Sequence, residues 1–181
     1  MSTGAIIAIV AAIIVIVAGL LFLANARRKR GHLRERFGPE YDRAVSEQPR
    51  REAERELGER ERRVDGLDIH QLSPVSRERY AQQWILVQEH FVDRPGTAVE
   101  EADHLVNALM SERGYPTESF EQQAADLSVA HASTLEHYRA AHDIQTQNAR
   151  TQVSTERLRE AMIRYRALFD DLLGPGPQPS H

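Results

Sequence analysis

The sequence predicts an all-α protein with an N-terminal transmembrane helix, a charged spacer helix and a domain of about five helices. Apolar residues recur at helical spacing in the second half of the chain, helix-capping residues separate these segments, and no alternating run indicates a strand. The expected divisions are a membrane anchor (1–26), a basic segment with the spacer helix (27–65), the helical domain (66–173) and a disordered tail (174–181).

The first element is an apolar run, Ala5 to Ala24, that contains no charged side chain. As a helix it would span about 30 Å, the thickness of the hydrocarbon layer of a bilayer. Basic residues follow the run and none precedes it, so the positive-inside rule places the N-terminus outside and the remainder in the cytoplasm. The expected localisation is therefore the cell membrane, with a single span.

A cleaved signal peptide is the alternative interpretation of this run, because Ala24-Asn25-Ala26 resembles a cleavage site. The run is longer than the apolar part of most signal peptides, lacks a preceding basic residue and is followed by a basic cluster. These features favour the anchor over cleavage.

The basic cluster after the run is expected to contact anionic lipid headgroups. Residues 27–63 contain 13 basic and 9 acidic residues, whereas residues 64–181 contain 10 basic and 18 acidic ones. The acidic remainder has no nucleic-acid signature, and the absence of cysteine excludes disulfides and thiolate chemistry. The residues expected at the headgroups are Arg27, Arg28, Lys29, Arg30, Arg34 and Arg36.

The spacer begins where Gly38 and Pro39 break the chain, and Pro39 suits the first position of a short helix. Residues 50–63 are almost entirely charged, with little apolar content beyond Ala53 and Leu57. So narrow an apolar stripe favours a solvated spacer helix, and a short self-associating coiled segment is the alternative.

The helical domain is expected to begin at a Ser73 cap, followed by a helix over about 74–92. Trp84 lies in the middle of its apolar face, so we predict that Trp84 is the centre of the core. The other members of this face are Tyr80, Val87 and Phe91.

Capping boxes at Thr97 and Ser133 predict the starts of two further helices, and a third helix is expected over about 118–128. Gly114 suits a left-handed position at a helix end. Residues 145–152 are polar and are expected to form a loop or a frayed helix end.

The last helix should start at a Ser154 cap and end at Gly174. With these four caps retained, a chain that begins near Gly66 is expected to fold without the preceding residues.

Four strings in the chain have a distinctive sequence: RFGPEYDR (36–43), FVD (91–93), RGYP (113–116) and YRAAH (138–142). On these strings the chain resembles a family of short bacterial proteins with one N-terminal membrane helix and an acidic helical remainder. The resemblance implies a bacterial membrane protein, and it brings no known activity or catalytic residue.

Glu101 and His104 have the i,i+3 spacing of one half of a di-iron carboxylate site. That site needs a second such pair, and no other histidine follows a glutamate at this spacing. His131, His137 and His142 are also not spaced as two ligands on one helix turn. The pattern favours surface and packing roles, and no metal or cofactor is expected.

Two turns, one with Asp93 and Arg94 and one with Arg113 and Tyr115, could together form a partner-binding rim. We expect a non-enzymatic, membrane-tethered cytoplasmic module for protein–protein interaction or self-association, with the bilayer as a further partner. The alternatives are a metal-binding or enzymatic domain that uses Glu101, His104 and nearby histidines, and an anionic-lipid sensor that uses Arg27 to Arg36.

Overall fold

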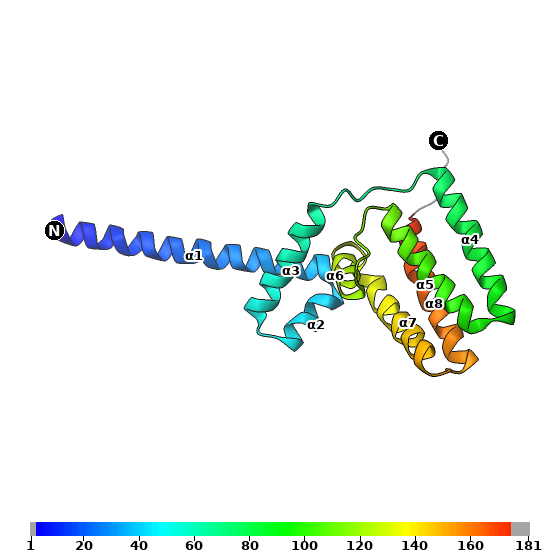
Figure 1. Ribbon diagram of the computed structural model, residues 1–181. Helices are drawn as coiled ribbons and strands as arrows, with labels where there is room; N and C mark the ends of the chain where they lie inside the picture. The colour runs from blue at the N-terminus through cyan, green and yellow to red at the C-terminus, as the bar shows by residue number, and fades with distance from the viewer. Residues whose placement is uncertain (1–2, 175–181) are drawn as a thin grey trace. The chain divides into compact units, whose positions relative to one another are not determined.

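The computed structural model describes the backbone of residues 3–174, together with the side chains of residues 14, 16–21, 23–25 and 27–174 (Figure 1). Within these residues the chain forms eight helices and no strand, which confirms the all-α prediction. The chain divides between Leu57 and Gly58 into two compact units, here called the N-terminal and C-terminal units.

The N-terminal unit contains α1 (Thr3–Phe37), α2 (Pro39–Glu47) and the first half of α3 (Arg50–Asp65). Gly38 separates the first two helices with a positive φ of 48°, and Pro39 occupies the first turn of α2. The predicted break and the short helix after it are therefore confirmed.

Helix α1 includes residues 3–26 of the predicted anchor without a break. Among the residues with described side chains, no helix contains a segment both long and apolar enough for a transmembrane span. This search does not cover the whole predicted span, because the side chains of some of its residues, including residues 5–13, are not among those described. Within the predicted span, the large apolar side chains that the structure describes are exposed: Ile14, Ile16, Val17, Leu20, Leu21 and Leu23. Further along α1, Leu33 and Phe37 are buried.

The prediction of a solvated spacer helix is wrong at two positions of α3, because the side chains of Ala53 and Leu57 are completely buried. Ion pairing also joins the three helices. Glu54 on α3 accepts a hydrogen bond from the Tyr41 hydroxyl on α2 (3.0 Å) and pairs with Arg30 on α1 (3.2 Å). Leu33 and Phe37 of α1 are buried as well, so the N-terminal unit has a small apolar core in addition to these polar contacts.

The C-terminal unit contains the second half of α3 and five further helices, the number predicted for residues 66–173 (Figure 1). Helix α5 packs against both α4 and α8, α7 lies alongside α8, and α6 packs against α7. The bounds are α4 (Pro74–Asp93), α5 (Pro95–Glu112), α6 (Phe120–Ala130), α7 (Ala132–Arg150) and α8 (Thr155–Leu173).

Trp84 is buried in the core of this unit, as predicted, with 1% of its surface exposed. Its ring stacks on Phe169 of α8 with 4.7 Å between the centroids. Tyr138 of α7 and Tyr165 of α8 are also buried and meet edge to face. The core is therefore built from aromatic rings on three helices, supported by aliphatic side chains of α5.

Two of the four predicted helix caps are confirmed. Ser73 Oγ accepts a hydrogen bond from the Ser76 N–H (3.0 Å), and Ser154 Oγ accepts one from the Arg157 N–H (3.4 Å). The caps at Thr97 and Ser133 are wrong, because α5 already begins at Pro95 and α7 at Ala132. Proline suits a first helical position, and only His131 separates α6 from α7.

The prediction for residues 145–152 is wrong over residues 145–150, because α7 continues to Arg150, and it holds for residues 151 and 152, which are not helical. Ile144 is the last buried residue of this helix. Beyond it the helix continues without a fully buried residue, and the Asn148 side chain lies beside Gly96 at the start of α5.

Gly114 has a φ of 92°, which agrees with the predicted left-handed position. A Cβ atom there would lie 2.2 Å from the carbonyl oxygen of Asp68, so only glycine fits. The segment before α4 thus lies directly against the end of α5, and the His70 N–H donates to the Arg113 carbonyl (3.0 Å).

The expected boundary between 65 and 66 differs from the observed division, which lies within α3. Arg63, in the second half of α3, pairs with Asp126 of α6 at 2.8 Å, and the Asp126 side chain has no exposed surface. A chain that begins at Gly66 would lose this partner of a buried carboxylate. Apart from Gly174, the predicted tail lies outside the described residues.

Candidate functional site

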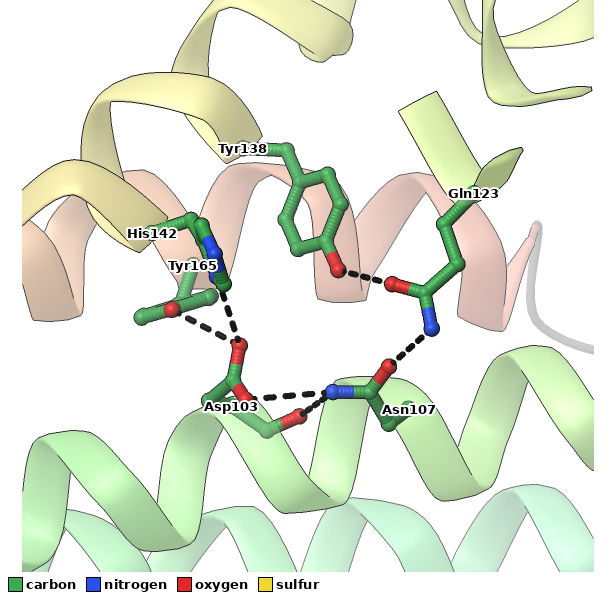
Figure 2. Close-up of polar contacts among 6 residues, drawn as sticks. All are labelled: Asp103, Asn107, Gln123, Tyr138, His142 and Tyr165. Atoms are coloured by element: carbon green, nitrogen blue, oxygen red, sulfur yellow. Dashed lines mark hydrogen bonds and ion pairs between the residues drawn. The ribbon is translucent and has the colours of Figure 1, made fainter. Parts of the chain in front are cut away.

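A network of polar side chains joins four helices of the C-terminal unit, with Asp103 of α5 at its centre (Figure 2). Asp103 Oδ1 accepts a hydrogen bond from the Tyr165 hydroxyl (2.8 Å), and its Oδ2 accepts one from Asn107 Nδ2 (3.1 Å). His142 Nδ1 lies 3.8 Å from Oδ1, beyond hydrogen-bonding distance. The His142 ring stacks on Phe120 with 3.8 Å between centroids.

The network extends from Asn107 to Gln123 in the first turn of α6 (Figure 2). Gln123 Nε2 donates to Asn107 Oδ1 (2.7 Å), and the Tyr138 hydroxyl donates to Gln123 Oε1 (2.6 Å). Burial, together with the nearby Asp103 carboxylate, raises the pKa of both Tyr138 and Tyr165. Both phenols therefore remain protonated and keep donating their hydrogen bonds at any physiological pH.

This network is best explained as a device that fixes helix register. Each phenol and amide in it already has a partner, so the hydrogen bonds select one alignment of α5, α6, α7 and α8. The Asp103 side chain is only 15% exposed, which leaves little of it accessible to a substrate.

A second polar cluster contains His131, the residue between α6 and α7. Its Nδ1 lies 2.8 Å from Asp171 Oδ2, which also accepts a hydrogen bond from the Thr134 hydroxyl (2.7 Å). Among the described residues, the buried His131 Nε2 has no hydrogen-bond partner. The structure thus separates His131 and His142 into different clusters, while His137 is exposed.

Glu101 and His104, the predicted metal half-site, both line a shallow groove of about 580 Å³ between α4 and α5. Glu101 pairs with His90 of α4 at 2.7 Å, and the His104 side chain is exposed. Within the part of the chain that the structure describes, no three His, Asp or Glu side chains are arranged to bind a metal ion.

A groove of about 280 Å³ separates α4 from α8 on another side of the unit. Trp84 and Phe91 line it from α4, and Met162 and Ile163 line it from α8. The indole N–H of Trp84 has no hydrogen-bond partner within the described chain.

Large apolar side chains are exposed beside this groove. Ile163 is 66% exposed, Ile85 is 54% exposed and Val92 is 82% exposed. Ile85 and Val92 lie three and four residues from Gln88, which also lines the groove, so all three residues are neighbours on one side of α4. We call the groove together with Ile85, Val92 and Ile163 the α4–α8 face.

The two turns proposed as a binding rim lie at opposite ends of α5, so they form no common surface. Asp93 and Arg94 are exposed at the α4–α5 junction. Arg113 donates to the carbonyl of Leu172 (3.0 Å), and Tyr115 is only 3% exposed. The turn at the end of α5 therefore ties α5 to α8, and its tyrosine is unavailable to a partner.

The predicted headgroup residues are all exposed on α1, but two of them also line a cleft in the N-terminal unit. Arg30 and Arg34 of α1 lie there opposite Arg50 of α3. The cleft has a volume of about 420 Å³, and the other residues lining it are Gly31, Tyr41, Asp42 and Val45.

Sequence reasoning missed Asp103, Gln123 and Arg50 because their partners are distant in the chain. Asp103 and Tyr165, for example, are 62 residues apart. The exposed Ile85 and Ile163 could have been recognised as apolar residues outside the buried stripes of their helices.

Comparison of the chain with protein families, with curated proteins and with solved structures finds no match. The resemblance to bacterial single-pass proteins therefore stays a prediction.

Proposed function

We propose that this protein is a membrane-tethered helical module that self-associates through the α4–α8 face. The main observation is the exposure of Ile85, Val92 and Ile163 around a groove whose lining is mainly apolar. Its polar lining residues are Gln88, Arg159 and Arg166. Clusters of exposed apolar side chains beside a groove are typical of protein-binding surfaces.

A second copy of the chain is the partner that this face fits best. The projecting isoleucines and the groove lie on the same surface, so two copies related by a two-fold axis can each insert a side chain into the other's groove. Such an insertion would also cover the floor of the groove, where Trp84 is located.

The proposed tether is the apolar run from Ala5 to Ala24, with the N-terminus outside and the C-terminal unit in the cytoplasm. Two features support it: the large apolar side chains described within this run are exposed, and a basic cluster follows the run. Anchoring in one bilayer would raise the effective concentration of the copies and favour weak self-association. A reporter fused after His181 that functions only outside the membrane would contradict this orientation.

The self-association can be tested by cysteine cross-linking, because the chain contains no cysteine of its own. Ile163→Cys in the full chain, reconstituted in vesicles, should form a disulfide-linked dimer under mild oxidation. Val75→Cys is the matched control, since Val75 is 80% exposed on α4 but lines neither groove.

A charge at the α4–α8 face should weaken the association. In a fluorescence energy-transfer assay between labelled copies in vesicles, we expect Ile85→Glu to lower the signal and Val75→Glu to leave it unchanged. If both variants match the parent chain, or if the parent chain is monomeric, the face does not mediate self-association.

A further inference from the structure

We propose that the cleft between α1, α2 and α3 binds the phosphate of an anionic lipid headgroup, with Arg30, Arg34 and Arg50 as its ligands. This inference rests on the proposed membrane tether and adds a defined site to it. The cleft lies wholly within the N-terminal unit.

The charges in the cleft are not balanced. Arg30 pairs with Glu54 at 3.2 Å, and Arg34 lies 3.5 Å from Asp42. No carboxylate among the described residues pairs with Arg50, although its side chain lines the cleft. The three guanidinium groups therefore exceed the two carboxylates by one positive charge, and Arg50 has its donors available for a phosphate.

The position of the cleft along α1 matches the depth of lipid phosphates. Arg30 follows Ala24 by six residues of continuous helix, a rise of about 9 Å. The headgroup layer extends roughly 5–8 Å beyond the hydrocarbon on each side of a bilayer. Since an arginine side chain can extend toward the interface, Arg30 can reach a phosphate from the cytoplasmic edge of that layer.

Convergence from two helices distinguishes this cleft from the rest of the basic cluster. Arg27, Arg28 and Lys29 are exposed and line no cleft, so they offer diffuse attraction to any anionic surface. Arg50 lies 20 residues beyond Arg30 in the sequence, and only the fold of α2 and α3 brings it to the same cleft. A built site of this kind can select an individual lipid molecule.

The test compares lipid retention by two neighbouring arginine variants of the full chain. The chain is extracted in mild detergent with an equal mixture of phosphatidylglycerol and phosphatidylcholine, and bound lipids are counted by native mass spectrometry. We expect the parent chain to retain phosphatidylglycerol preferentially and Arg50→Gln to lower this retention about fivefold, the effect of one basic residue near an anionic surface. Arg51→Gln removes the same charge from an exposed residue outside the cleft and should retain the lipid as the parent does.

Three results would overturn the inference. Equal losses of lipid in both variants would indicate diffuse attraction, and equal retention of the two lipids by the parent chain would indicate no anionic preference. Displacement of the lipid by millimolar inorganic phosphate would indicate a site for the free anion. Extraction of the chain from membranes by alkaline carbonate is measured separately. A chain released by carbonate contradicts the tether itself, whereas a retained chain with indistinguishable variants contradicts only the cleft.

Discussion

The two units of this protein differ in the size of their apolar cores. In the N-terminal unit, a small core with Leu33, Phe37 and Leu57 is accompanied by polar contacts from Glu54 to Arg30 and Tyr41. In the C-terminal unit, aromatic side chains such as Trp84 and Phe169 stack within a continuous apolar core.

The difference indicates where most of the folding free energy resides. Each fully buried large apolar side chain contributes about 1.5–3 kcal/mol, a partly exposed ion pair only about 0–1 kcal/mol, and the C-terminal unit buries many more large apolar side chains. We therefore expect the C-terminal unit to be the more stable one and the N-terminal unit to open more readily.

The largest effect is expected for Trp84→Ala, because it removes an almost fully buried ring and its stacking partner's contact. Truncating a core aromatic costs about 3–5 kcal/mol. Urea denaturation followed by circular dichroism should show this loss in the full chain. Val75→Ala, at an exposed position of the same helix, is the control and should change stability little. A Trp84→Ala chain that unfolds at the parent's urea concentration would show that the stacked ring contributes nothing.

The second effect concerns the buried carboxylate of Asp126. Besides Arg63, Asp126 accepts a hydrogen bond from Gln122 (2.8 Å). Arg63→Met leaves this buried charge with the amide as its partner and should cost about 2–3 kcal/mol. Arg62→Met is the control, since Arg62 only donates to the Gly58 carbonyl at the surface.

A double variant makes the Arg63 prediction specific. In the background of Asp126→Asn there is no buried charge to compensate, so Arg63→Met should cost much less than it does in the parent chain. An equal loss in both backgrounds would show that Arg63 acts through helix α3 alone.

Local sequence signals predicted the secondary structure best where one residue decides the conformation. Gly38, Gly114 and Gly174 have positive φ, as their positions at helix ends require. Ser73 and Ser154 are caps because α4 and α8 begin at the residues directly after them, Pro74 and Thr155. At Thr97 and Ser133, an upstream residue starts the helix first, and the capping pattern alone could not reveal this.

The candidate sites were less predictable because they depend on tertiary packing. The helical spacing identified Trp84 as a core residue, since burial follows from periodicity along a single helix. The partner of Asp103 on α8 and the position of Arg50 beside α1 depend on how helices pack together. No spacing within one helix contains that information.

The third prediction tests the polar network through pH. Burial raises the pKa of Tyr138 and Tyr165 in the folded state, so the unfolded chain loses these protons first as the pH rises. Their contribution to stability is complete below pH 10 and should fall above it, by about 1.4 kcal/mol per pH unit for each phenol. Urea denaturation at pH 9 and pH 11 should show this decrease, and Tyr165→Phe should reduce its slope. An unchanged slope in Tyr165→Phe would contradict a buried, protonated Tyr165.

The smallest effect is expected in the N-terminal unit, from Tyr41→Phe. The change removes the hydroxyl that donates to Glu54, and the net loss of such a hydrogen bond is about 0.5–1.5 kcal/mol. Because the C-terminal unit dominates a global melt, hydrogen exchange read by mass spectrometry is the suitable measurement. Peptides from α2 and from the first half of α3 should exchange faster in the variant, while peptides from α5 and α8 should exchange as in the parent chain. Faster exchange throughout both units would show that they unfold together, and the contrast between two separately stabilised units would then be wrong.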